Sequence, residues 1–437
     1  MKSKLSRRHF ISGSGLGLMG MVLSAQDPVG APQQPAPPAA ARIREFRALG
    51  RTGFNVSDIS SGGPMDAAVL RALLNAGVNY IDTAESYGRG QSEKVTGTVV
   101  KEYDRKKLFI TTKLVIKKET TKEEVVSRFR QCLERLQMEY VDCLMIHSAA
   151  NVAIVKSVAF HDAAKQLKDE GILRFVGISN HGSQWDNSLE LEPMDKVLLA
   201  AAEDGRFDVM LLVYNFLQRE MGEKILKACQ VNKIGATLMK TNPVGGYLEM
   251  KERVDMLLKE GKPVPENLAR VFASLKERAD AAETFIKQNH LQNPIEIKNA
   301  AIRFALSNED VHSVCCSCDN FGDVESFLAL SGKRLDLADK SKLTLYQEGC
   351  SALYCRHACG ACESACPSRV PVNTILRYSH YFEAQGREKY AMLKYAQLPT
   401  AKADLCRSCD GRCEKKCPYG VPVQGLLTLA HQQLQLG

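Results

Sequence analysis

The fold is decided by the stretch VNYIDTAESYG, residues 78–88. Its first half, Val78 to Asp82, is a short apolar run with β-branched and aromatic residues, which is typical of a buried strand. Its second half turns polar and contains Tyr87 and Gly88, so the strand ends and a loop begins. Reactive side chains directly after a strand are typical of parallel barrels, whose functional residues lie at the carboxyl ends of the strands.

Seven more runs of this kind flank the stretch, with helical patterns between them. The clearest helical pattern spans Lys122 to Leu136, where apolar residues recur at i, i+3 and i+4. Strands that alternate with amphipathic helices build parallel β-α-β units, and eight of them predict an α/β (β/α)8 TIM barrel. The predicted strands are Val56–Ser61, Val78–Asp82, Leu108–Thr112, Val141–Ile146, Arg174–Ile178, Asp208–Val213, Gly235–Met239 and His312–Cys316.

The chain of 437 residues is too long for one barrel of about 250 residues, so a second folded unit is expected. We assign residues 42–332 to the barrel and residues 333–437 to a small C-terminal domain. A charged, helix-prone insert from Tyr247 to Pro294 follows the seventh strand. Loops on that side of a barrel form active sites, so we interpret the insert as a lid.

The first 25 residues have the order of a targeting segment, with basic residues before a mildly apolar stretch. Ser6-Arg7-Arg8-His9-Phe10-Ile11 resembles the twin-arginine export signal. This resemblance implies the twin-arginine translocation machinery as a partner and a periplasmic location, with membrane association if the signal stays uncleaved. Residues 26–41 are rich in Pro and Ala and are interpreted as a linker.

Composition sets limits on the partners. Hydrophobic residues make up 45% and charged residues 25% of the chain, as in ordinary globular proteins. The net charge of +8 is spread without a basic stripe interleaved with aromatic residues, so no nucleic-acid partner is expected.

Polar residues close four consecutive predicted strands. Asp82 closes the second strand, Lys113 the third, and His147 the fourth, while Ser179 and Asn180 close the fifth. Tyr87 lies five residues beyond Asp82. Because strand ends converge at one face of a barrel, we expect these side chains in one pocket.

These residues resemble the aldo-keto reductase family. The matching motifs are Asp82-Thr83-Ala84-Glu85-Ser86-Tyr87-Gly88, Gly90-Gln91-Ser92-Glu93 and Gly177-Ile178-Ser179-Asn180, and the resemblance covers about Phe46 to Leu330. It implies a catalytic tetrad of Tyr87, Lys113, Asp82 and His147 that acts on a small carbonyl or alcohol substrate.

The chemistry explains the tetrad, because hydride reduction of a carbonyl leaves an alkoxide that needs a proton. Tyr87 is the expected donor. A nearby Lys113 ammonium favours the ionised phenol and is expected to lower its pKa. Asp82 would hold Lys113, and His147 would orient the substrate oxygen.

The resemblance also implies an NAD(P) cofactor. It places Ser179 and Asn180 on the nicotinamide carboxamide and Gly63 near the nicotinamide ribose, and Lys240 is a candidate for a phosphate or the substrate. The adenine end departs from the family pattern, since no Lys or Arg lies between Asp310 and Gly332. An acidic Asp319 there would repel a ribose 2'-phosphate. The neighbouring Cys315, Cys316 and Cys318 are interpreted as small hydrophobic residues.

The last 85 residues contain eight of the 15 cysteines, in two runs that each end in Cys-Pro. The runs are Cys355, Cys359, Cys362 and Cys366, then Cys406, Cys409, Cys413 and Cys417. They resemble a two-cluster ferredoxin of the α-helical kind, with two 4Fe-4S clusters. The resemblance implies one ligand set of Cys355, Cys359, Cys362 and Cys417, and another of Cys406, Cys409, Cys413 and Cys366. Helix is expected over Thr374 to Tyr395.

Two alternatives stay open for these cysteines, structural zinc and disulfides. Cys350 is left unassigned.

Together these features predict an exported carbonyl or alcohol oxidoreductase that uses NAD(P) and contains two clusters. Three roles stay open for the clusters: electron transfer to or from an outside redox partner, a structural role, or service to a bound cofactor. The alternative is an electron-transfer or interaction module whose barrel has lost turnover.

Overall fold

The computed structural model describes residues 41–182, 191–244, 246–259, 266–383, 387–399 and 401–435. Contacts divide the chain into Met1–Ala40 and Ala41–Gly437, and all that follows concerns the second unit. The predicted export signal and residues 26–40 of the predicted linker lie outside the described residues.

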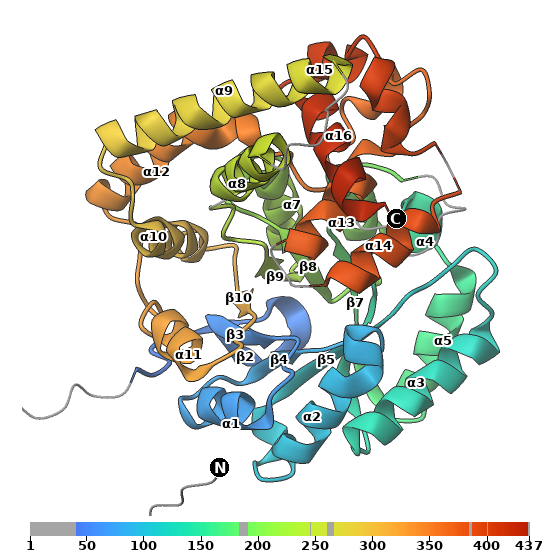
Figure 1. Ribbon diagram of the computed structural model, residues 1–437. Coiled ribbons are helices and arrows are strands. Elements are labelled where there is room, and N and C mark those ends of the chain that lie inside the picture. The colour runs from blue at the N-terminus through green and yellow to red at the C-terminus, as the bar shows by residue number, and fades with distance from the viewer. Residues whose placement is uncertain are drawn as a thin grey trace, which may run out of the picture. The chain divides into compact units, whose positions relative to one another are not determined.

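A closed barrel of eight parallel strands forms the core of this unit (Figure 1). Neighbouring strands pair in the order β10-β3-β4-β5-β6-β7-β8-β9, and β10 closes the ring by pairing with both β9 and β3. The predicted TIM barrel is therefore confirmed. Its strands are β3 (Ile59–Gly62), β4 (Tyr80–Asp82), β5 (Phe109–Leu114), β6 (Val141–Ile146), β7 (Leu173–Asn180), β8 (Val209–Val213), β9 (Gly235–Met239) and β10 (Ser313–Cys316).

The predicted first strand, Val56–Ser61, is wrong in its extent. Its first part belongs to β2 (Asn55–Ser57), which pairs antiparallel with β1 (Phe46–Ala48), and only β3 enters the barrel. The chain bends between them at Asp58. The buried Asp58 side chain accepts hydrogen bonds from Ser331 Oγ at 2.6 Å and from the Gly332 N–H at 2.7 Å, and these contacts fix the bend.

Helices between the strands surround the barrel (Figure 1). The predicted helix Lys122–Leu136 is confirmed as α3 and shows why such segments fold. Thr121 caps its start by accepting the Glu124 N–H at 3.2 Å, and its buried residues lie on one face. The others are α1 (Ala67–Asn75), α2 (Gln91–Val100), α4 (Val152–Val155), α5 (Val158–Asp169), α6 (Met194–Asp204), α7 (Arg219–Val231), α10 (Pro294–Leu306) and α11 (Phe321–Leu328).

Large side chains close the amino-terminal end of the barrel interior. Tyr80 and Phe109 stack with ring centroids 5.4 Å apart and pack with Leu49, Met145 and Leu211. The interior is therefore solid at this end, and polar side chains at the opposite strand ends are left to form a site.

The insert after β9 forms two helices, α8 (Gly246–Lys259) and α9 (Glu266–Gln288). Leu275 of α9 packs against Leu429 of the last helix, α16 (Val423–Leu434), and Arg253 donates to the Leu429 carbonyl at 3.1 Å. The insert thus packs against the C-terminal region, and its role as a lid stays a prediction.

The C-terminal region is helical and has its own apolar core. Helix is confirmed over most of Thr374 to Tyr395, as α13 (Val372–Glu383) and α14 (Glu388–Ala396). Two further helices flank or interrupt the cysteine runs: α12 (Leu337–Cys350) precedes the first run, and α15 (Arg412–Lys416) lies within the second.

The loop that begins the first cysteine run docks on the barrel. Gln218, just before α7, donates to the His357 carbonyl at 2.7 Å and accepts the His357 N–H at 2.8 Å. The Met194 N–H donates to the Ala358 carbonyl at 2.9 Å. These contacts place the C-terminal helices over the strand ends. Among the described residues, none of the helices has the length and apolar character needed to span a membrane.

Candidate active site and cysteine cavity

The four predicted catalytic residues meet at the carboxyl ends of β4, β5 and β6. Lys113, fully buried, is the central group. Its Nζ donates to Asp82 Oδ2 at 2.6 Å, to the Thr83 carbonyl at 2.8 Å and to Tyr87 Oη at 3.4 Å. The ammonium therefore touches both the carboxylate that balances it and the phenol that it is expected to tune.

The Tyr87 ring is positioned by the tight turn after β4. Gly88 and Arg89 have φ of 57° and 56°, so the chain reverses directly after the tyrosine. The ring lies edge-on to His147, with centroids 5.5 Å apart. Gly63, in the loop after β3, has a φ of +63°, which side-chain-bearing residues rarely adopt. A Cβ at this position would lie 3.3 Å from the Tyr87 ring, so glycine allows the loop to lie close to this tyrosine.

The pKa of Tyr87 is raised, which corrects the expected direction. Burial is the largest cause, because it disfavours the phenolate, and Lys113 opposes it by favouring the phenolate. Burial also raises the pKa of Asp82, again against the pull of Lys113. For Lys113 itself, burial disfavours the charge, but Asp82 and Tyr87 outweigh it and the pKa is raised.

His147 is held neutral. Burial, together with the charge of Lys113, lowers its pKa well below the ordinary value. Ser86 Oγ lies 3.3 Å from Nδ1 of His147. A neutral imidazole beside the phenol can hydrogen-bond a substrate oxygen without competing for the proton of Tyr87.

Other polar residues of the matched motifs stabilise the fold around the tetrad. The buried Glu93 carboxylate accepts Thr112 Oγ1 at 2.6 Å and pairs with Arg135 at 2.5 Å. Glu85 pairs with Arg128 of α3. These ion pairs hold the loop after β4, and with it Tyr87.

Ser179 and Asn180 lie at the end of β7 and are buried. Ser179 Oγ donates to the Ile146 carbonyl at 3.3 Å, and Asn180 Nδ2 donates to the Ala149 carbonyl at 2.6 Å. Asn180 Oδ1 also accepts the Gly182 N–H at 3.2 Å. Both side chains are fixed by the barrel, and each keeps hydrogen-bonding capacity within the described structure.

Lys240 follows β9, and its side chain lies close to residues of the C-terminal region. Its Nζ lies 5.7 Å from the centroid of the Tyr381 ring, and burial, together with the charges of Arg377 and Arg387, lowers its pKa well below the ordinary value. Sequence reasoning missed Arg377, His380 and Tyr381, all on α13. No local pattern marks them, because only the docking of α13 brings them beside strand ends more than 130 residues earlier in the chain.

The loop expected to meet the adenine is acidic, with one cation nearby. Asp319 and Asp323 lie at the start of α11, where the Asp319 N–H donates to Asp323 at 3.1 Å. Lys298 of α10 lies 4.3 Å from the centroid of Phe327 and acts electrostatically on Cys318. The sequence between 310 and 332 gave no hint of this lysine.

A cavity between the two cysteine runs is lined by Cys355, Cys359, Cys362 and Cys417. These are the four members of one predicted ligand set. The other four also gather, because the charges of Cys413, Cys366 and Cys409 add to burial in raising the pKa of Cys406 to about 12. The fold thus pairs three cysteines of each run with the fourth of the other.

Donors and cations lie beside the thiols. The Val370 N–H donates to Cys366 Sγ at 3.4 Å, and Asn373 Nδ2 lies 4.0 Å from Cys355 Sγ. Arg356 lies 4.0 Å from the centroid of Tyr419, beside the cavity. All 15 cysteines are free thiols. In the described part of the chain, no group of three or more His, Cys, Asp or Glu is arranged to hold a single metal ion.

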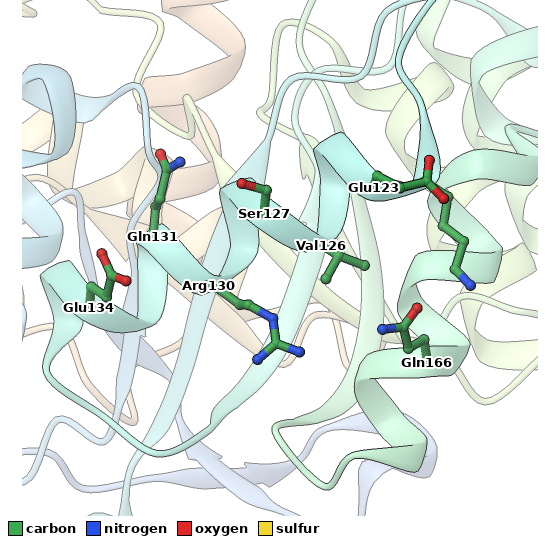
Figure 2. A pocket seen from close by; sticks show the side chains of 8 residues that line it. Glu123, Val126, Ser127, Arg130, Gln131, Glu134 and Gln166 are labelled. Carbon is green, nitrogen blue, oxygen red and sulfur yellow. The ribbon is translucent and has the colours of Figure 1, made fainter.

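A further groove lies on the outer surface, between α3 and α5 (Figure 2). Arg130 and Gln166 face it from the two helices, with Glu123 and Glu134 along α3. None of the strand-end residues or clustered cysteines lines it.

Comparisons with known proteins bear on the barrel. The sequence model of the Aldo/keto reductase family matches residues 63–344. The aldo-keto reductase YhdN of Bacillus subtilis is 28% identical over 215 residues, which are 44% of this chain and 61% of YhdN. L-galactose dehydrogenase of Arabidopsis thaliana is 28% identical over 309 residues, 65% of this chain and 87% of that enzyme. The solved aldo-keto reductase AKR11C1 from Bacillus halodurans has a TM-score of 0.48 and 19% identity, covering 69% of this chain and 95% of its own.

Proposed function

Because the chain belongs to the aldo/keto reductase family, we propose that this oxidoreductase interconverts a small carbonyl compound and its alcohol, with Tyr87 as the proton donor. The contact that carries the proposal is the buried line from Asp82 Oδ2 through Lys113 Nζ to Tyr87 Oη, with distances of 2.6 Å and 3.4 Å. A buried ion pair aimed at a phenol is costly to maintain for stability alone, and proton transfer at the phenol gives it a function.

Each of the four tetrad residues has a defined task in this proposal. Tyr87 Oη donates its proton to the carbonyl oxygen during reduction, and Lys113 stabilises the phenolate that is left. Neutral His147 donates a hydrogen bond to the same oxygen and sets its direction. Asp82 balances the charge of Lys113, so the ammonium stays charged although it is buried.

We further propose that NAD(P) is the hydride carrier, since a carbonyl reduction of this type requires a two-electron donor. The fit rests on two observations. Gly63 keeps the space beside the Tyr87 ring free of a side chain. The amide of Asn180 is fixed at the strand end and retains one N–H and one lone pair among its described contacts, so it would hold the nicotinamide carboxamide together with Ser179.

Replacing Tyr87 with phenylalanine tests the assignment. We expect Tyr87→Phe to lower kcat for aldehyde reduction by about 10²- to 10⁴-fold, the usual range for general acid catalysis, with little change in nucleotide affinity. The measurement is steady-state turnover of a panel of aldehydes with NADH and NADPH, with circular dichroism to verify folding. Unchanged turnover in the variant would remove Tyr87 from the mechanism.

For the C-terminal region we propose two 4Fe-4S clusters, which would supply one-electron transfer to an outside redox partner. The support is the cavity lined by Cys355, Cys359, Cys362 and Cys417, into which four thiols face without a disulfide. Burial raises the pKa of Cys362 to about 12, and repulsion from the Glu363 carboxylate and from neighbouring thiolates adds to this shift. A bound cationic metal core offsets that repulsion.

Iron and acid-labile sulfide, assayed after anaerobic purification, test this proposal. We expect about eight irons per chain and about half as many in Cys359→Ala. The matched control is Cys350→Ala, since Cys350 is a buried cysteine at the end of α12 that belongs to neither group. Zinc without sulfide, or disulfides in the purified protein, would contradict the cluster assignment.

We propose that the protein is exported to the periplasm by the twin-arginine route, on the basis of the sequence Ser6 to Ile11. This route carries folded proteins, so metal centres can be assembled before export. A fusion of residues 1–41 to a reporter should reach the periplasm, and the substitution of Arg7 and Arg8 by lysine should retain it in the cytoplasm.

The acidic loop after β10 favours one alternative, an electron-transfer module whose barrel has lost turnover. Asp319 and Asp323 leave little electrostatic support for a ribose 2'-phosphate. Equilibrium binding of NAD and NADP separates the two functions. No measurable affinity for either nucleotide, in a protein with its full iron content, would favour the alternative.

A further inference from the structure

We infer that Lys240 and Arg377 form an anion-binding subsite beside the tetrad, so that the substrate is a carbonyl or alcohol compound with its own carboxylate or phosphate group. This inference rests on the proposed function for the identity of the reacting group, but not for the existence of the subsite. The two cations come from different parts of the chain, the end of β9 and the middle of α13.

The two cations share one aromatic neighbour. The Tyr381 ring centroid lies 5.7 Å from Lys240 Nζ and 6.0 Å from the Arg377 guanidinium carbon. Arg377 is 2% exposed and is among the largest fully buried side chains of the described structure. Lys240 is half-buried, so two like charges are held around one ring at the edge of a region from which water is largely excluded, and they repel each other.

Neither cation has a carboxylate partner among the described residues. Arg377 Nε is buried without a hydrogen-bond acceptor there, and Nη1 meets only Nε2 of His357 at 3.5 Å. The charges that act on Lys240 are those of Arg377 and Arg387, both positive. Arg377 also acts electrostatically on the thiol of Cys355, so an ionised Cys355 offsets part of its charge. Lys240 has no negative neighbour of this kind among the described residues. Because a charge held away from water is costly unless it is paired, an anion from outside the described chain would complete this arrangement.

The position of the pair relative to the tetrad points to the substrate. The substrate oxygen in the proposed function lies between Tyr87 and His147. The next ring in that direction is His181, 6.3 Å from His147, and the charges of Lys240 and Arg377 both act on His181. Tyr381 is also close enough to act on Tyr87. A substrate that extends from Tyr87 past His147 would thus bring its far end to the two cations.

The two cations suit a small oxyanion. A guanidinium offers parallel N–H donors that match two oxygens of a carboxylate or phosphate, while an ammonium adds a single point charge. A neutral substrate of the same shape would leave both cations unpaired. Such sites discriminate strongly, because the wrong ligand leaves buried groups without partners.

Paired substrates test the inference in the full-length protein. The first pair is 4-oxobutanoate and its neutral amide, and the second is glyceraldehyde 3-phosphate and glyceraldehyde. We expect Arg377→Met and Lys240→Met each to lower kcat/KM for the charged member of one pair by about 30-fold or more, and for the neutral member by less than about threefold. The substrate pair whose charged member loses kcat/KM in the variants shows whether the subsite binds a carboxylate or a phosphate. Arg130→Met, in the outer groove of Figure 2, is the matched control and should change neither value.

A binding measurement separates this inference from the proposed function. Calorimetry with succinate and with inorganic phosphate should detect one of them in the wild type and in Tyr87→Phe, but not in Arg377→Met. If no carbonyl compound is turned over, the proposed function fails. The calorimetric result still shows whether the anion-binding subsite exists. Equal loss of charged and neutral turnover, with binding of both anions intact, would overturn the subsite, as would weakened NAD(P) binding alone.

The thermal stability of Arg377→Met distinguishes anion binding by Arg377 from a purely structural role. Replacing an unpaired buried cation with an apolar side chain of similar length is neutral or stabilising. We therefore expect the Tm of Arg377→Met to stay the same or rise. A clear fall in Tm, together with equal losses for both substrate types, would show that Arg377 supports the packing of α13 instead.

Discussion

At the scale of single residues, the Lys113–Asp82 ion pair dominates the site. Both groups are buried, and the ammonium is held 2.6 Å from the carboxylate. Removing one member leaves the other charge without its partner in a place that water cannot reach. We predict that Lys113→Met lowers the free energy of unfolding by about 3–5 kcal/mol, the range for a broken buried pair. Urea unfolding followed by circular dichroism measures this loss.

The double variant provides the control for this pair. Asp82→Asn combined with Lys113→Met removes both charges, so it should recover most of the stability lost in the single variant while staying inactive. If the double variant is as unstable as the sum of the two single variants, the pair contributes through packing and not through its charges.

At the scale of secondary-structure elements, the contact between α2 and α3 depends on one glycine. A Cβ at Gly97 of α2 would lie 2.2 Å from the carbonyl oxygen of Leu136, at the end of α3. Backbone cannot move aside as a side chain can. Alanine favours a helix by about 1 kcal/mol over glycine, yet we predict that Gly97→Ala lowers the free energy of unfolding by about 1–3 kcal/mol.

Thr98→Ala is the matched control in the same helix. Thr98 is exposed and its hydroxyl donates to the Lys94 carbonyl one turn earlier, so its loss should change stability by less than about 0.5 kcal/mol. Thermal unfolding of the two variants side by side compares the crowded face of α2 with its exposed face. A stabilised Gly97→Ala would show that α2 shifts at little cost.

At the scale of the whole molecule, docking of α13 on the barrel buries several histidines together. Burial lowers the pKa of His147, His181 and His380 well below the ordinary value. Below about pH 6.5 these histidines therefore bind protons in the unfolded chain but stay neutral in the folded chain. The free energy of unfolding falls as the pH falls. Each histidine contributes up to about 1.4 kcal/mol per pH unit once its unfolded form is fully protonated. Between pH 6.5 and 5.5 the unfolded histidines are only partly protonated, so the three together cost about 3 kcal/mol.

Chemical unfolding at pH 7.5, 6.5 and 5.5 measures this dependence. His380→Gln should reduce the slope below pH 6.5 by at most about one third, because burial also lowers the pKa of His161, His312 and His431, which contribute to the rest of the slope. His290→Gln, an exposed histidine at the end of the insert, should leave the slope unchanged. The same slope in His380→Gln as in the wild type would mean that the acid sensitivity comes from other groups.

The sequence by itself determined the barrel and the identity of the tetrad. Strand and helix periodicities are local, and β6 and β9 occur at the predicted residues because each is a short, mostly apolar run followed by a polar residue. The first strand was predicted too long, since the bend at Asp58 depends on Ser331 and Gly332, more than 270 positions away. Strand ends of a barrel must converge, so Tyr87 and Lys113 could be placed together from their positions alone.

Only the tertiary structure decided what surrounds the tetrad. The net shift of the Tyr87 pKa is set by burial, which no local pattern reports, and it outweighs the neighbouring ammonium. Arg377 and Tyr381 reach the site because Gln218 and Met194 of the barrel bind the backbone at His357 and Ala358. Periodicity records which face of a segment is apolar, whereas the docking of one folded region on another depends on contacts between residues far apart in the chain.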